Sequence, residues 1–194
     1  MAAGRWVFVL LVVAGVAAAA LGTSPTPAAS PEMGSAPANV VSVHLLDLTA
    51  PVPATWVRQP PATSMRLLQF RVPGGAGSGD AEFVVFYFGV GQGGSVEANI
   101  TRWQSQFTSP DGKPVQAVVQ HLTVTGMPVT TVELSGTYAR GVGMGPVGAP
   151  TPDQTLLVAI VETPRGNLTL QLHGTRATVE SNQEAFWSLV RGIK

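Results

Sequence analysis

Residues 115–138, VQAVVQHLTVTGMPVTTVELSGTY, carry the clearest signal for how the chain folds. This stretch contains two strand-like runs, Val115 to Val124 and Met127 to Tyr138, which a Thr-Gly pair separates. A connection of two residues is too short to hold a crossover helix, so the two strands must run antiparallel. The stretch therefore predicts an antiparallel hairpin around which the rest of a sheet can be arranged.

The rest of the chain supplies further strands. Apolar runs that are alternating or continuous and are bounded by Gly and Pro indicate strands. They occur in His44–Trp56, Met65–Val72, Glu82–Phe88, Thr155–Thr163 and Asn167–His173. The first of these runs contains two prolines, so it is predicted to be an edge strand followed by a turn. We expect an antiparallel sheet of about six strands.

Two amphipathic helices complete the predicted fold. Apolar residues recur at helical spacing from Ser95 to Phe107, where Ser95 is a favourable N-cap, and again from Thr178 to Ile193. Each apolar stripe must be buried, and the sheet is the surface that can bury it. The expected fold class is therefore α+β, an antiparallel sheet packed with two main helices.

The N-terminus has the pattern of an export signal. Arg5 precedes the apolar run Trp6 to Leu21, which ends in small residues suited to cleavage. The run is at the short end for a transmembrane helix, so residues 1–22 are predicted to be a cleaved signal peptide or an uncleaved anchor in the inner membrane. Residues 23–39, rich in Pro, Ala and Ser, are predicted to be a disordered linker. Residues 40–194 then form a single periplasmic or extracellular domain.

Composition excludes several functional classes. The chain has 11 Lys and Arg against 11 Asp and Glu, so it lacks the basic excess that capture of nucleic acid requires. It has no cysteine. That excludes disulfides, thiolate metal sites, cysteine nucleophiles and lipid attachment through an N-terminal cysteine.

The order of elements resembles that of a known group of proteins. It runs through a Pro-Ala-Thr-Trp segment at residues 53–56, Met65-Arg66, a strand, a helix carrying Asn99, Arg102 and Trp103, an antiparallel meander and a closing helix. This order is similar to that of uncharacterised secreted bacterial proteins with an architecture like the PsbP-like fold, which is named for an extrinsic subunit of the oxygen-evolving complex. The resemblance covers roughly Leu45 to Lys194. It implies a sheet between helices in a domain that docks onto or assists other proteins, and it carries over no catalytic or metal-binding residue.

The most specific motif is Gly-Val-Gly-Gln-Gly-Gly, residues 89–94, which follows a strand and opens a helix. In a dinucleotide site such glycines bring the backbone close to the pyrophosphate, and Asp111 stands at about the distance of a ribose-binding acid. The context does not fit, because Asp111 lies in a Pro-Asp-Gly turn and the later strands pair as hairpins. No cofactor is therefore predicted. The remaining interpretations are weak anion binding at the helix start or a plain flexible loop.

Interaction residues are predicted where flexible loops meet the sheet. A second Gly-rich segment, Arg140 to Pro152, could form a lip around a pocket together with the first, or serve only as a long hairpin connection. Arg102 could pair with an acid, stack on an aromatic ring or belong to a docking face. The interaction candidates are Gly91, Gly93, Gly94, Ser95, Arg102 and Arg140.

The titratable residues show no evident catalytic pattern. His44, His121 and His173 are scattered, without the spacing that places two ring nitrogens on one face for a metal ion. Glu133 and Glu162 lie in strand runs. They could face each other as a carboxylate pair suited to glycoside hydrolysis, or simply occupy the wet face of the sheet.

The sequence thus favours an extracytoplasmic, non-enzymatic domain that binds a protein partner or a small ligand as an accessory of the cell envelope. The alternative is a secreted hydrolase that uses carboxylates from separate strands. Neither interpretation involves nucleic acid, and contact with a membrane is expected only through an uncleaved N-terminal segment.

N-terminal sequencing of the protein from its native host tests the export prediction. Cleavage predicts a start near Leu21 or Thr23 and a free domain, whereas an intact Met1 or Ala2 means a tethered domain. Recovery of the intact protein in the cytosolic fraction would contradict both forms of the prediction.

Overall fold

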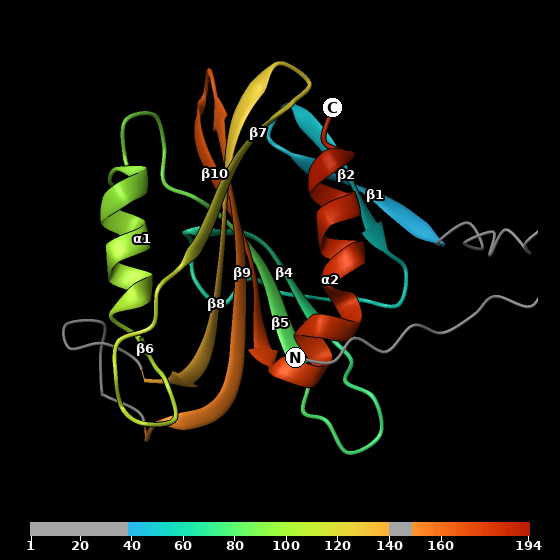
Figure 1. Cartoon of the computed structure of the whole chain (residues 1–194). Helices are drawn as coiled ribbons and strands as arrows, with labels where there is room; N and C mark the ends of the chain where they lie inside the picture. The colour runs from blue at the N-terminus through green and yellow to red at the C-terminus, as the bar shows by residue number, and fades with distance from the viewer. Residues whose placement is uncertain (1–38, 140–148) are drawn as a thin grey trace, which may run out of the picture. The chain divides into compact units, whose positions relative to one another are not determined.

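The structure, a computed structural model, describes residues 39–139 and 149–194 (Figure 1). Within these residues the centre is an eight-stranded sheet whose neighbouring strands are all antiparallel. One path through the sheet runs β3 (Val57–Gln59), β4 (Arg66–Val72), β5 (Ala81–Tyr87), β10 (Gly166–Thr175), β9 (Thr151–Thr163), β8 (Met127–Tyr138) and β6 (Phe107–Thr108). The eighth strand, β7 (Val118–Val124), pairs with β8 as well.

Two helices lie on opposite faces of this sheet. Figure 1 shows α1 (Val96–Gln104) on one side and α2 (Arg176–Arg191) on the other, with the hairpin of β1 (Val40–Leu45) and β2 (Leu48–Pro53) next to α2. The prediction of an α+β fold with two main helices is confirmed. Neither helix is long and apolar enough to cross a membrane, and the predicted export segment and all of the predicted linker except Asn39 lie outside the described residues.

The predicted hairpin of residues 115–138 is formed by β7 and β8. Their pairing runs without a register shift from Val124 opposite Met127 to Val118 opposite Glu133. Thr125 and Gly126 connect them with φ values of 48° and 80°. Two consecutive residues with positive φ give a type I′ turn, whose twist matches that of the flanking strands.

The sheet has more strands than the six or so expected. The additional strands β3 and β6 are 3 and 2 residues long, too short to show an alternating pattern. The segment His44–Trp56 does not supply an edge strand of the main sheet, because β1 and β2 pair with each other instead. Leu46, with φ of 61°, lies at the turn that makes this pairing possible.

The first helix is shorter than predicted. It ends at Gln104, and Ser105 Oγ donates a hydrogen bond to the carbonyl oxygen of Arg102 at 2.7 Å. Phe107 therefore belongs to β6, where it pairs with Tyr138 and is 1% exposed. The prediction that the helix extends to Phe107 was wrong, because this residue matches the helical spacing but is buried as part of a strand.

The larger core lies between the sheet and α2 with its neighbouring hairpin. Its aromatic centre is Phe83, whose ring centroid lies 5.0 Å from that of Trp56 and 6.1 Å from that of Phe186. Trp56 Nε1 donates a hydrogen bond of 3.0 Å to Asn182 Oδ1 on α2, which satisfies the buried indole. These contacts hold α2 against the sheet.

A smaller core lies between the sheet and α1. Trp103 is the buried residue that the helix contributes, at 3% exposure, and Val96 and Ile100 pack beside it. The strands contribute Phe107, Val132, Leu134, Leu156, Val158 and Ile160. Both faces of the sheet are therefore covered where β8 and β9 run, and this coverage explains the continuously apolar sequence of β9.

Replacing Phe83 with Ala should lower the free energy of unfolding by about 3–5 kcal/mol, because the fully buried ring leaves a cavity among three aromatic neighbours. Urea denaturation followed by fluorescence measures the change. Val57→Ala is the matched control, since Val57 is 44% exposed at the sheet edge and its truncation should change stability by no more than about 0.5 kcal/mol. If both variants lost the same free energy of unfolding, Phe83 would not be at the centre of the core.

Candidate functional site

The glycine segment forms a tight loop between β5 and α1. Gly91, Gly93 and Gly94 have φ values of 67°, 91° and 79°, in the left-handed region that favours glycine. A Cβ on Gly93 would lie 2.9 Å from the Phe88 ring. Ser95 is the N-cap, as predicted, because its Oγ accepts a hydrogen bond of 3.1 Å from Ala98 N–H.

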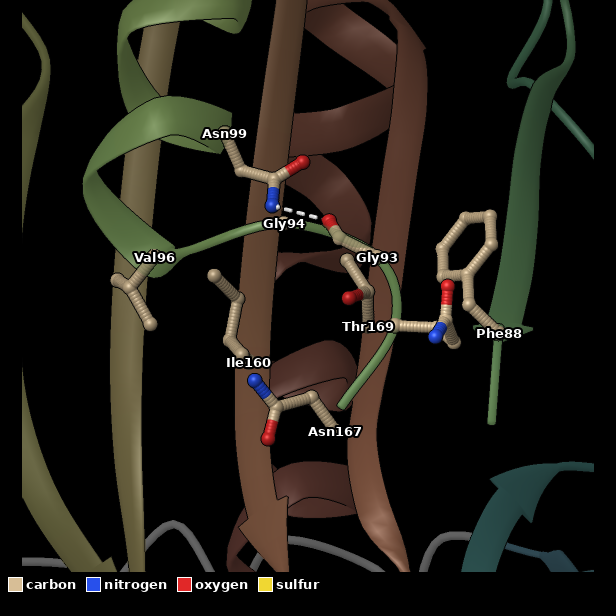
Figure 2. Close-up of a pocket in the computed structure, with 9 residues that line it drawn as sticks. Phe88, Gly93, Gly94, Val96, Asn99, Ile160, Asn167 and Thr169 are labelled. Atoms are coloured by element: carbon tan, nitrogen blue, oxygen red, sulfur yellow. Dashed lines mark hydrogen bonds between the residues drawn. The ribbon is translucent and has the colours of Figure 1, made fainter. Parts of the chain in front are cut away.

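Asn99 closes this loop from within (Figure 2). Its Nδ2 donates to the carbonyl oxygens of Gly93 and Ser95 at 2.8 and 2.9 Å. The adjoining hollow, which Phe88, Asn167 and Thr169 help to line, holds about 10 Å³, room for about one water molecule. The loop is therefore closed by internal hydrogen bonds, and the hollow beside it is too small to enclose a phosphate group.

Arg102 joins the same network. Its Nη2 donates to Asn99 Oδ1 at 2.7 Å, and its guanidinium carbon lies 5.7 Å from the Trp103 ring centroid. Of the interaction candidates, the structure thus brings Gly93, Gly94, Ser95 and Arg102 around Asn99, with Gly91 in the same loop. Arg140 and most of its Gly-rich segment lie outside the described residues.

The two carboxylates of the hydrolase hypothesis lie on opposite faces of the sheet. Glu133 stands opposite Leu157, whose side chain faces α2. Glu162 continues the row of Val158 and Ile160, which faces α1, because alternate residues of a strand share a face. The carboxylate pair is therefore not formed, and the hypothesis loses its geometric basis.

The three histidines lie on three different strands. His44 is exposed on β1, His121 Nδ1 lies 3.1 Å from Thr130 Oγ1, and His173 is on β10. Across residues 39–139 and 149–194, no three His, Asp or Glu side chains are grouped so that they could hold a metal ion.

His173 is the most perturbed titratable residue. Its ring lies 4.5 Å from that of Tyr138 and 6.2 Å from that of Phe107, and its buried Nε2 has no hydrogen-bond partner among the described residues. Burial lowers the pKa of His173 from 6.5 to about 4. Glu82, its neighbour on β5, accepts hydrogen bonds of 2.8 Å from Arg66 and from Gln69 instead. His173 is therefore neutral at physiological pH.

A groove lies between β7 and α2. Its volume is about 240 Å³, and its lining residues are Gln120, His121, Leu122, Thr131, Trp187, Val190 and Arg191. Arg191 is at the rim, where its Nη2 donates to Glu184 Oε1 at 2.6 Å. We call this concavity the α2 groove.

One hydrogen bond fixes the two sides of the α2 groove to each other. Thr125 Oγ1, at the tip of the β7–β8 hairpin, donates to the carbonyl oxygen of Ile193 at 2.7 Å, just beyond the end of α2. Sequence reasoning missed this groove. Its one local signal is the absence of Asp, Glu, Lys and Arg from residue 114 to residue 132, which is unusual for a strand at a sheet edge.

Comparison with solved structures places the fold among PsbP-like proteins. The chain is similar to cyanobacterial PsbP (CyanoP) from Synechocystis, with a TM-score of 0.52 and 12% identity over 83% of this chain and 95% of that one. It is also similar to PA94, a protein of unknown function from Pseudomonas aeruginosa, with a TM-score of 0.44 and 13% identity over 78% and 94% of the two chains. No protein-family model and no curated protein matches the sequence. The resemblance inferred from the order of elements is confirmed at the level of the fold.

The buried ring nitrogen of His173 predicts a specific loss of stability in acid. Its pKa in the folded state is about 4, below the ordinary 6.5, so between these values the unfolded chain binds a proton that the folded chain does not. The free energy of unfolding should therefore fall by about 3 kcal/mol as the pH drops from 7 to 4, through this residue alone. Urea titrations of the wild type and His173→Phe at several pH values measure the difference. Parallel curves for the two proteins would contradict the prediction.

Proposed function

We propose that this chain is a non-enzymatic domain that acts outside the cytoplasm by docking onto a protein partner at the α2 groove. The groove is the observation on which the proposal rests. The N-terminal export pattern supports the location, and the docking role agrees with what the PsbP-like resemblance implies.

The volume of the α2 groove favours a protein over a small molecule. Pockets that enclose a ligand of drug size hold roughly 300–1,000 Å³, whereas this groove holds about 240 Å³ and is open to solvent along β7. Such a space accepts one or two side chains. The remaining contact area would come from the surface around it, as in a protein interface.

The chemistry of the lining also fits a protein interface. Trp187 and Leu122 are half-buried and offer apolar surface, and Arg191 stands exposed at the rim. Trp and Arg are enriched among the residues that dominate the binding energy of protein interfaces. Thr131 and Gln120 add polar side chains to the lining, which would fix the orientation of a bound chain.

Trp187→Ala should reduce recovery of the partner at least about tenfold, since truncating a central interface tryptophan costs roughly 2 kcal/mol or more. The measurement is affinity purification of the tagged, exported protein from its native host, with quantification of any stoichiometric protein by mass spectrometry. Ser181→Ala, an exposed change on the same helix, is the matched control. The thermal unfolding temperature of each variant is measured as well, to check that the fold is retained.

Two results would count against the proposal. One is that no protein co-purifies in stoichiometric amount with the wild type. The other is that Trp187→Ala and Ser181→Ala recover the same protein equally well.

A further inference from the structure

The outer side of β7 is an open sheet edge. β7 pairs with β8 on one side, and no strand of the described residues pairs with it on the other. It is 7 residues long, and its first two residues, Val118 and Val119, are 58% and 37% exposed. In Figure 1 it is the yellow strand that forms a hairpin with β8.

The turn geometry shows which backbone groups are free at this edge. In a two-residue hairpin the residues that flank the turn, here Val124 and Met127, form a hydrogen-bonded pair. Hydrogen-bonded and non-hydrogen-bonded positions alternate along an antiparallel pair. The N–H and C=O groups of Val119, His121 and Thr123 therefore point away from β8, toward solvent.

Nothing in β7 protects this edge from pairing. Natural edge strands are blocked by Lys, by Pro, by a bulge or by shortness. β7 has no proline, no formally charged residue and no register shift against β8. The edge strand β3, at the far end of the sheet, is 3 residues long and carries Arg58, so only one of these two edges is left open.

We propose that β7 pairs antiparallel with β7 of a second copy of this chain, about a two-fold axis at His121. This register uses all seven residues. It places Val119 opposite Thr123 of the second copy and His121 opposite its own equivalent, so outward-pointing groups meet outward-pointing groups and form about six main-chain hydrogen bonds. An isologous contact of this kind closes on itself and gives a dimer.

The charges of the two surfaces favour a second copy as the occupant. Self-pairing in this register brings together only uncharged residues apart from the central histidines, namely Val118 with Val124, Val119 with Thr123 and Gln120 with Leu122. The formal net charge of the chain is 0 at pH 7, so two copies do not repel each other at long range. Both copies also present edges of equal length.

The dimer extends the α2 groove without filling it. A two-fold axis normal to the sheet keeps the two α2 helices on the same side. Gln120 and Leu122, whose side chains face α2, then continue across the joint into the same residues of the second copy. The inference does not depend on the docking partner proposed above.

Charge substitutions at the axis test this pairing. The wild-type chain should have the mass of a dimer by light scattering coupled to size exclusion. His121→Lys and His121→Glu should each be monomeric, because like charges directly opposite each other destabilise a strand pair. An equimolar mixture of the two variants should regain the dimer mass. Trp187→Ala, which tests the α2 groove, should remain dimeric, so the two proposals can fail separately.

The register can be tested by disulfide formation, since the chain has no cysteine of its own. Under mild oxidation His121→Cys should form a covalent dimer, because paired strand residues have Cα atoms about 5.5 Å apart. Thr123→Cys is the matched control on the same exposed face. Its own equivalent would lie four residues along the strand, about 13 Å away, beyond disulfide reach.

Three results would overturn the proposal. The first is a monomeric wild type across a dilution series into the high micromolar range. The second is a dimer that survives both charge variants. The third is a dimer in which Thr123→Cys cross-links as well as His121→Cys, which would place the contact in another register or on another surface.

Discussion

The middle of β9 is buried on both faces, and the arrangement of the other elements follows from this. All residues from Gln154 to Val161 are buried. A strand of this kind needs a layer above and a layer below, because apolar side chains alternate between the two faces. α1 covers the face of Leu156, Val158 and Ile160, and α2 with the β1–β2 hairpin covers the face of Leu157, Ala159 and Val161.

The two layers do not cover the sheet to its edges. α2 packs on β9, β10 and β2, and α1 packs on β8, so β7 stands at the margin of the α2 layer. The α2 groove is the consequence of this margin, since the helix ends where the sheet continues. β7 exposes apolar side chains because the sheet is wider than the layers that cover it.

Parts of the fold could be predicted because their signals are local. The two-residue connection after Val124 determines an antiparallel hairpin by its length alone. The strands β3 and β6 gave no such signal, because they are too short to alternate, and Phe107 matched a helical stripe although it packs from the sheet. Likewise, β1 pairs with β2 because Leu46 adopts a positive φ at the turn between them. The two prolines of β2 had instead indicated a single edge strand followed by a turn.

The site was harder to predict than the fold, for a related reason. The glycine segment was recognisable as a loop at a helix start, but the hydrogen bonds from Asn99 that close it depend on side-chain direction. The α2 groove joins residues of β7 to residues of α2 that are distant in the chain, so no short motif encodes it. The register between β8 and β9 likewise decided that Glu133 and Glu162 face apart.

The hydrogen bond from Thr125 to Ile193 has a consequence for affinity. It ties the hairpin tip to the residue that follows α2, so both walls of the groove keep their spacing before any binder arrives. Association normally loses free energy when loops and side chains become ordered at the interface. For the docking proposed above, walls that are already tied together would lower that cost of ordering.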